Sequence, residues 1–220
     1  MRLLILGSTG PIGILLVREA LAAFEGSAII LYVRSPEKIP EDLKTNPRCV
    51  VIEGQLDDMA ALSKAMEGVD IVLSALGPSQ FTHPPGTPLA HAYRRIINVM
   101  KENKIDRLIA LGTASIEDKL DQFNFVYYSM VKSVSISMRN AYKEIRAIGA
   151  VIQASELEHW TIVRVPVLSN DAKREVRVGY IGGPEIKNNI TLARVGWAAF
   201  VVEEMKNSQW DKKMPLLVSA

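Results

Sequence analysis

The first turn of the chain constrains the fold most. A short apolar run at residues 3–6 leads directly into Gly7-Ser8-Thr9-Gly10-Pro11-Ile12-Gly13, and residues 12–24 then carry apolar side chains at helical spacing. A continuous apolar run of this kind is typical of a strand buried on both faces of a parallel sheet. A strand, a glycine turn and a helix in this order predict the opening βα unit of a doubly wound sheet.

The same alternation continues along the chain. We predict further strands at residues 28–33, 48–53, 70–75, 107–112 and 160–165, helices at 59–66, 88–103 and 190–205, and an edge strand at 215–219. Residues 128–155 form either one long helix or two abutting ones. Alternating strands and helices imply right-handed crossovers. The predicted fold class is therefore α/β: a doubly wound, mostly parallel Rossmann sheet with helices on both faces, as a single domain over residues 1–220.

The irregular stretches are expected to form the substrate pocket. The irregular stretches are residues 78–87, 116–125 and 168–189, and each follows the carboxyl end of a predicted strand. The pocket is expected to be formed by the loops at residues 78–92, 116–127 and 168–189, which contain these stretches. In open α/β sheets, ligands bind at this edge.

Composition narrows the classes of protein and partner. The chain is 48% hydrophobic and 23% charged, which is typical of a packed globular protein. Its formal net charge is only +2 without a dense basic run, so a nucleic-acid partner is not expected. A single cysteine, Cys49, allows no internal disulfide and forms no metal motif. No apolar stretch reaches the ~20 residues of a membrane span. We expect a cytoplasmic protein.

The glycines of the first turn have separate expected roles. Gly7 permits the tight turn out of the strand, Gly10 lets the backbone approach a pyrophosphate, and Gly13 lets the helix pack closely on the strand. Free N–H groups and the helix dipole favour phosphate at this position. The predicted pyrophosphate site is the whole turn, comprising Gly7, Ser8, Thr9, Gly10, Pro11, Ile12 and Gly13.

The end of the second strand indicates which dinucleotide binds. Arg34 stands where an NAD-preferring protein would place a carboxylate for the ribose 2′-hydroxyl. Its planar donors match a 2′-phosphate, and Ser35 and Lys38 add a hydroxyl and a charge. We therefore predict NADP(H) as the cofactor.

The end of the third strand leaves two readings open. Leu56, Asp57 and Asp58 follow that strand, and an aspartate here either accepts a hydrogen bond from the adenine amino group or caps the helix that starts at Met59.

Together these segments resemble the atypical short-chain dehydrogenases, in particular the NmrA-like and biliverdin-reductase-B-like NAD(P)-binding proteins. The matching segments are GSTGPIG, YVRSPEK, GQLDD, VLSALG and TIVRVP. The resemblance implies that the nicotinamide ribose is lined by Ser74, Ala75, Leu76 and Gly77. It also implies that Val165 and Pro166 pass close to the nicotinamide.

A proton-transfer set is also present in the sequence. Tyr128 and Lys132 match the Tyr-x-x-x-Lys pattern, and Ser115 lies roughly a dozen residues upstream. On a helix, this spacing puts phenol and ammonium on one face. A chance match is the alternative, because the interval from Tyr128 to the sixth strand is longer than the family pattern. His83 is a weaker candidate, expected to be an exposed loop histidine, and no metal site is visible.

The expected function is that of an NADPH-dependent oxidoreductase. It would reduce a small or medium, fairly apolar carbonyl, enone or flavin-like acceptor. Two alternatives remain open: an NADP-binding sensor without turnover, and a non-redox isomerase or cyclase on the same scaffold. We expect a small-molecule substrate, no membrane partner, and a monomer or homodimer.

Overall fold

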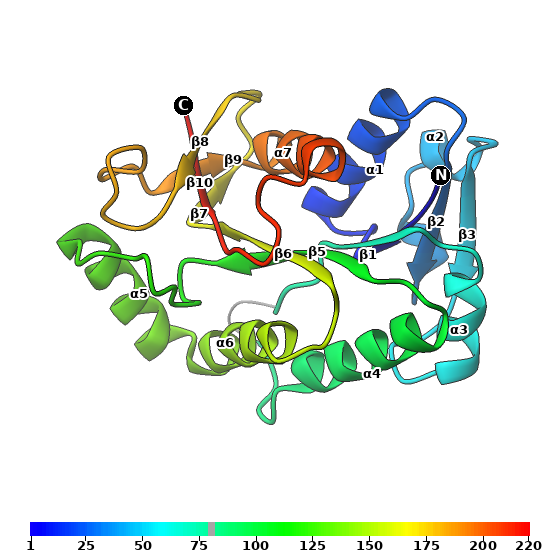
Figure 1. The fold of residues 1–220 in the computed structure, drawn as a ribbon, viewed down its shortest axis with the longest axis horizontal. Coiled ribbons are helices and arrows are strands. Elements are labelled where there is room, and N and C mark those ends of the chain that lie inside the picture. Colours follow the sequence, from blue (N-terminus) through cyan, green and yellow to red (C-terminus); the bar gives the residue numbers. More distant parts are fainter. Residues whose placement is uncertain (79–81) are drawn as a thin grey trace.

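A twisted, mostly parallel sheet forms the centre of the protein (Figure 1). The computed structural model describes residues 1–78 and 82–220. In this part of the chain, the main sheet has eight strands in the order β3-β2-β1-β4-β5-β6-β10-β8. They are β1 (Arg2–Leu6), β2 (Ala28–Val33), β3 (Cys49–Glu53), β4 (Ile71–Ser74), β5 (Arg107–Thr113), β6 (His159–Val165), β8 (Val176–Gly179) and β10 (Leu216–Ser219). The predicted doubly wound Rossmann architecture is confirmed.

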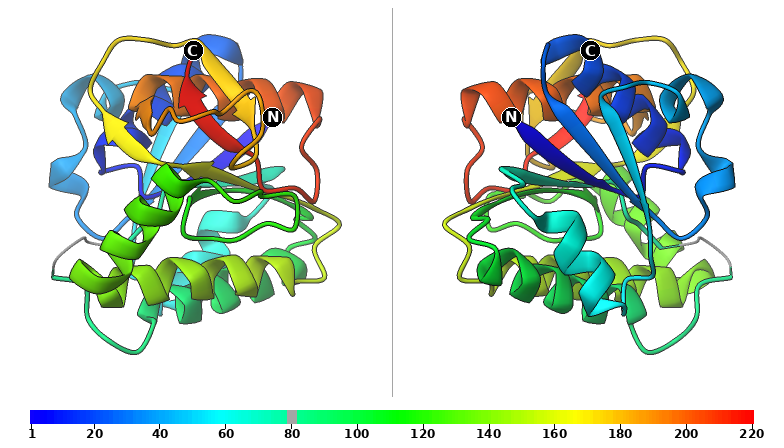
Figure 2. Two further views of the ribbon diagram at one scale, coloured as in Figure 1. Left: turned by 90° about the vertical axis from the view of Figure 1, so that its left-hand side faces the viewer. Right: turned by 90° about the vertical axis from the view of Figure 1, so that its right-hand side faces the viewer.

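Helices cover both faces of the sheet (Figure 2). One face carries α1 (Pro11–Ala23) and α7 (Arg194–Asn207); the other carries α3 (Met59–Met66), α4 (Pro88–Glu102) and α6 (Arg139–Gln153). The remaining elements are η1 (Pro36–Lys38), α2 (Glu41–Lys44), α5 (Phe125–Ser137) and a small sheet of β7 (Val167–Ser169) with β9 (Thr191–Ala193). No helix in the described residues has the length and apolar character needed to cross a bilayer.

The alternation of side chains along β1 explains its continuous apolar sequence. Leu3 and Ile5 pack into the core beneath α1 and α7, whereas Leu4 and Leu6 pack into the core beneath α3, α4 and α6. All four side chains are fully buried. A strand covered on both faces needs apolar residues at every position, which is why the run predicted the layered fold.

The strand order reverses at β1, and this reversal places the site. β1 pairs in parallel with β2 on one side and with β4 on the other, so that Leu6 lies opposite both Tyr32 and Ser74. The chain therefore leaves β1, β2 and β4 at the same edge. A crevice at such a switch point is the usual ligand site of open α/β sheets.

The C-terminal third differs from the sequence prediction. The last helix begins at Arg194 rather than residue 190, because residues 191–193 form β9. Residues 168–189, expected to be irregular, contain β8, and β8 pairs antiparallel with β10. Since β8 covers its outer side, β10 is an interior strand and not the predicted edge. Of the two alternatives for residues 128–155, the structure has the two abutting helices, which meet at Met138, where the backbone is non-helical (φ −127°).

Candidate functional site

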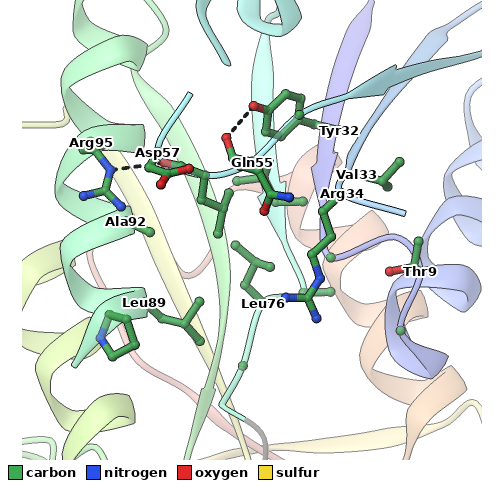
Figure 3. Close-up of a pocket in the computed structure, with 18 of the residues that line it drawn as sticks. Thr9, Tyr32, Val33, Arg34, Gln55, Asp57, Leu76, Leu89, Ala92 and Arg95 are labelled. Atoms are coloured by element: carbon green, nitrogen blue, oxygen red, sulfur yellow. Dashed lines mark hydrogen bonds between the residues drawn. The ribbon is translucent and has the colours of Figure 1, made fainter. Parts of the chain in front are cut away.

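A cavity of about 600 Å³ lies at the switch point. Its walls come from the glycine turn, the ends of β2, β3 and β4, and the start of α4 (Figure 3). Half of the predicted cofactor residues line it: Gly7, Thr9, Gly10, Arg34, Leu56, Asp57, Ala75, Leu76 and Gly77. The others are not among the described residues that line it: Ser8, Pro11, Ile12, Gly13, Ser35, Lys38, Ser74, Val165 and Pro166.

In the glycine turn, the backbone packs directly against neighbouring backbone. Gly7 and Gly13 have no space for a side chain. Gly7 has a positive φ of +78°, and a Cβ there would lie 2.9 Å from the carbonyl carbon of Ala75. A Cβ on Gly13 would lie 2.1 Å from the carbonyl oxygen of Gly7. The start of α1 and the residue after β4 therefore lie in close contact with the backbone of the turn. Backbone therefore forms the cavity floor.

The start of α1 has the features of an anion site. Its N-cap residue, Gly10, carries no side chain that could cap the helix, and Pro11 occupies the first helical position. No side chain in the described residues caps this turn. The N–H groups of the first turn are thus available to a phosphate, which the helix dipole also favours.

Arg34 is an exposed arginine that extends into the cavity toward Leu76 (Figure 3). Within the described residues it makes no ion pair and no side-chain hydrogen bond. Ser35 is half-buried and Lys38 is exposed at the following turn. Arg34 is therefore the cation that a charged ligand in the cavity would meet first on this wall.

The two aspartates that follow β3 have different surroundings. Asp58 caps α3, because its Oδ1 accepts a hydrogen bond from the backbone N–H of Ala61 at 2.9 Å. Asp57 lines the cavity instead. The capping reading is confirmed for Asp58, and the adenine contact of Asp57 stays a prediction.

Two side chains that sequence reasoning missed fix this segment in place. The Tyr32 hydroxyl donates to the carbonyl of Gln55 at 2.7 Å, and Arg95 Nε donates to the carbonyl of Leu56 at 3.1 Å (Figure 3). Burial, followed by the nearby charges of Asp58 and Asp57, raises the pKa of Tyr32 to about 12. Tyr32 is therefore a neutral donor at ordinary pH. Its position in a strand gave no local signal of this role, and neither did the position of Arg95 in α4.

Ser74 faces away from the cavity. It is fully buried, and its hydroxyl lies 2.6 Å from the Tyr93 hydroxyl beneath α4. Burial raises the pKa of Tyr93, which keeps this phenol protonated. The next residues, Ala75, Leu76 and Gly77, do line the cavity.

The structure does not bring the predicted proton-transfer residues to the cavity. Tyr128 and Lys132 are exposed on α5, with 56% of Tyr128 accessible, and Tyr128 packs its ring near Phe123. Ser115 is buried just after β5. None of the three is among the described residues that line the cavity. The set remains a prediction.

The sixth strand ends in a buried ion pair. Arg164 is fully buried and holds Asp121 through two hydrogen bonds of 2.6 and 2.9 Å. Val165 is buried beside it and Pro166 is half-buried.

His83 differs from the expectation of an exposed loop histidine. It is buried, lines the cavity, and its Nε2 lies 2.7 Å from Glu144 of α6. A contact between residues so distant in the chain leaves no trace in local sequence. Residues 79–81 of the predicted pocket loop 78–92 lie outside the described residues.

Comparison with known proteins supplies the family. Residues 7–208 match the model of a family described as NAD(P)H-binding. The chain belongs to this family. The expected membership of an NAD(P)-binding family is thereby confirmed.

Solved structures share the fold at low sequence identity. A wide-type short-chain dehydrogenase/reductase from Veillonella parvula, in complex with NADP, is 18% identical, with 99% of this chain and 94% of that chain covered and a TM-score of 0.79. ChuY, an anaerobillin reductase from Escherichia coli O157:H7, is 17% identical, with coverage of 100% and 97% and a TM-score of 0.77. A Rossmann-fold NAD(P)-binding protein from Shigella flexneri is 23% identical, with coverage of 99% and 93% and a TM-score of 0.72.

The residues present fit the family's dinucleotide. Side chains are sterically excluded at Gly7 and Gly13, which leaves a backbone cradle at the uncapped start of α1. The cavity continues from this cradle to Arg34 on one wall and Asp57 on another. These groups match a pyrophosphate, a ribose phosphate and an adenine amino group in chemical type.

Proposed function

We propose that this protein is an NADPH-dependent oxidoreductase that reduces a small or medium, fairly apolar carbonyl, enone or flavin-like acceptor. The observation that carries the proposal is Arg34, a cation without a partner in the described residues that extends into the cavity where an NAD-preferring site would have a carboxylate. Family membership supports nicotinamide dinucleotide binding, and the identity of the dinucleotide rests on this arginine.

The chain's own residues would bind and orient the cofactor. The N–H groups at the start of α1 hold the pyrophosphate, and the Arg34 guanidinium pairs with the 2′-phosphate through parallel hydrogen bonds. Leu76, Leu89 and Pro84 give the cavity apolar walls that exclude water from the bound ligand. When bound, NADPH supplies hydride for the reduction.

The first experiment measures cofactor choice. Calorimetry on the purified protein should give a Kd for NADPH at least ~10-fold below that for NADH, about 1.4 kcal/mol. Arg34→Ala should remove most of this difference. Arg18→Ala is the matched control, because Arg18 is an exposed arginine paired with Asp42 and does not line the cavity. Equal affinities for the two cofactors in the unmodified protein would overturn the NADPH assignment.

The second experiment asks for turnover. NADPH oxidation is followed with a panel of apolar aldehydes, ketones, enones and flavins, and at least one acceptor should sustain multiple turnovers. A protein that binds NADPH tightly and oxidises it with none of them would be a sensor.

The sensor is the second candidate function. It is favoured by the exposed position of Tyr128 and Lys132, which leaves the Tyr-x-x-x-Lys pair outside the cavity walls. A sensor needs the cofactor site without a proton donor, so the two functions separate on the acceptor panel.

A further inference from the structure

We propose that His83 is the proton donor of the reduction and that Glu144 is its positioning residue. This inference rests on the proposed reductase function and adds to it the residue that completes the reaction. It starts from the buried pair of His83 and Glu144 at the cavity; the sequence offered His83 only as a weaker candidate and gave no sign of this pairing.

Glu144 is held rigidly in the interior. Its side chain is fully buried in α6, Oε1 accepts from the backbone N–H of Ala90 at 2.8 Å, and Oε2 accepts from that of Leu89 at 3.0 Å. Both donors belong to the first turn of α4. The carboxylate therefore satisfies the start of one helix from the side of another.

The same carboxylate fixes the orientation and tautomer of His83. Its Oε2 lies 2.7 Å from His83 Nε2. Because Glu144 already accepts two backbone hydrogen bonds, it acts toward His83 as an acceptor as well, so Nε2 carries a proton. Asn140 Nδ2 donates to the His83 carbonyl at 3.0 Å, which anchors the backbone of the histidine to α6 too.

The second ring nitrogen is the group left for chemistry. Nδ1 makes no hydrogen bond to any described residue. It is also not one of the buried polar atoms that lack a partner, so it is accessible to a bound ligand. His83 lines the cavity, although only 5% of its side chain is accessible. The same cavity is also lined by the apolar residues Pro84, Pro88 and Leu89. A histidine that has one nitrogen bound to a carboxylate, and the other without a hydrogen bond to any described residue, has the arrangement that acid–base catalysis uses.

The proposed step accounts for every electron and proton that is transferred. The electrophilic carbon of the acceptor receives hydride from NADPH, which is oxidised to NADP⁺, and the acceptor's heteroatom takes the Nδ1 proton of the His83 imidazolium. The neutral imidazole then takes a proton from water. Glu144 stabilises the imidazolium before the transfer and remains a carboxylate throughout. Glu144 itself is not among the residues that line the cavity; of the described residues that do, the charged ones are Arg34, Asp57 and Arg95.

The decisive variant is His83→Gln. The glutamine amide can still donate to Glu144 in place of Nε2, but it has no proton to give up in place of Nδ1. We expect kcat to fall ~10²-fold or more, as for other positioned general acids, with NADPH affinity nearly unchanged. The alkaline limb of the kcat profile should disappear in this variant. If His83 served only to connect its loop to α6, His83→Gln would leave kcat and its pH profile unchanged.

Two variants serve as comparisons. His91→Gln changes an exposed histidine of α4 that contacts Arg94 and does not line the cavity, so its turnover should equal that of the unmodified protein. Tyr128→Phe tests the donor suggested by the sequence and should also retain turnover. A loss in Tyr128→Phe together with full activity in His83→Gln would assign the proton to the tyrosine and overturn the inference.

A readout independent of turnover is the tautomer of the ring. The chain has only three histidines, so ¹⁵N-histidine NMR can be assigned with single variants. The neutral His83 ring should carry its proton on Nε2, and its Nδ1 signal should move when the product NADP⁺ and an acceptor analogue bind. A neutral ring protonated on Nδ1 would overturn the inference. Full turnover in His83→Gln would overturn it while leaving the reductase intact, whereas no turnover by the unmodified protein would overturn the reductase function itself.

Discussion

At the scale of single residues, Gly10 and Gly13 have separable roles although they share one turn. Gly10 lines the cavity, has an extended backbone (φ −82°, ψ 158°), and a Cβ there would meet only the Gly7 carbonyl at 3.4 Å. Gly13 does not line the cavity, and its Cβ would lie 2.1 Å from the same oxygen. One glycine keeps space for a ligand, and the other keeps space for the backbone.

Gly10→Val should therefore abolish NADPH binding in a folded protein. The branched side chain fits the local backbone but projects into the space that a pyrophosphate would need. Calorimetry and a thermal melt on the same sample test this prediction. Unchanged affinity in a folded Gly10→Val protein would rule out the glycine turn as the phosphate site.

Gly13→Ala should show the opposite pattern and reduce stability first. Its Cβ cannot fit unless α1 moves away from the turn, and overpacking of this kind costs ~1–3 kcal/mol. Gly10→Ala is the control, since its Cβ makes ordinary contact at 3.4 Å. Chemical denaturation compares the free energies of unfolding, and equal values for the two variants would contradict the assignment of roles.

The sequence led to residues that line the cavity only where a local pattern marks them. The glycine turn and Arg34 follow directly from their places after β1 and β2. The position of Ser74 was not predictable, because its direction depends on Tyr93 across the core. The burial of His83 depends on Glu144, 61 residues away in the chain. Side chains oriented by distant partners are outside the reach of local pattern.

At the scale of elements, one carboxylate ties together the segments after β5 and β6. Asp121 pairs with the buried Arg164 of β6, and its Oδ1 also accepts from the backbone N–H of Ile181 at 3.0 Å. Its Oδ2 accepts from the N–H of Asp118 at 2.9 Å. Asp121 thus links the segment after β5 and the segment after β8 to Arg164 of β6.

Asp121→Ala should lower the free energy of unfolding by about 3–5 kcal/mol, because it leaves the Arg164 charge buried without its partner. The comparison is Glu203→Ala, which removes an exposed pair with Lys206 and should cost at most about 1 kcal/mol. Urea denaturation of both variants provides the measurement. A similar small loss in each would show that Arg164 finds other partners or water.

Most helices and strands up to β6 were predictable from the sequence, whereas the short strands β8 and β9 were not. From β1 to β6, the strands follow from runs of apolar residues, because parallel strands are buried on both faces, and the longer helices follow from helical spacing. The short η1 and α2 were not predicted. β8 and β9 were missed because they are short and only partly covered, so their sequences carry no continuous apolar run. Their pairing partners, β10 and β7, are distant in the chain or equally short.

At the scale of the whole molecule, the layered core keeps several phenols out of water. Tyr32 and Tyr93 belong to the core beneath α3, α4 and α6, and Tyr127 belongs to a smaller cluster beside β10. Burial is the main cause that raises the pKa of each phenol, and for Tyr32 the value is about 12. The folded protein therefore retains protons that the unfolded chain releases near the ordinary tyrosine pKa of about 10.

This difference predicts a loss of stability at alkaline pH. A phenol whose pKa is higher in the folded state contributes its full stabilisation below pH ~10, and the contribution falls as pH rises from there toward the folded value of about 12. Denaturant midpoints measured across this interval should decline, and phenolate absorbance should appear together with unfolding. Tyr32→Phe removes one of these protons, so its midpoint should fall less steeply, although loss of the hydrogen bond to Gln55 lowers stability at neutral pH by about 0.5–1.5 kcal/mol. Equal slopes for Tyr32→Phe and the unmodified protein would mean that Tyr32 ionises without unfolding the core around it.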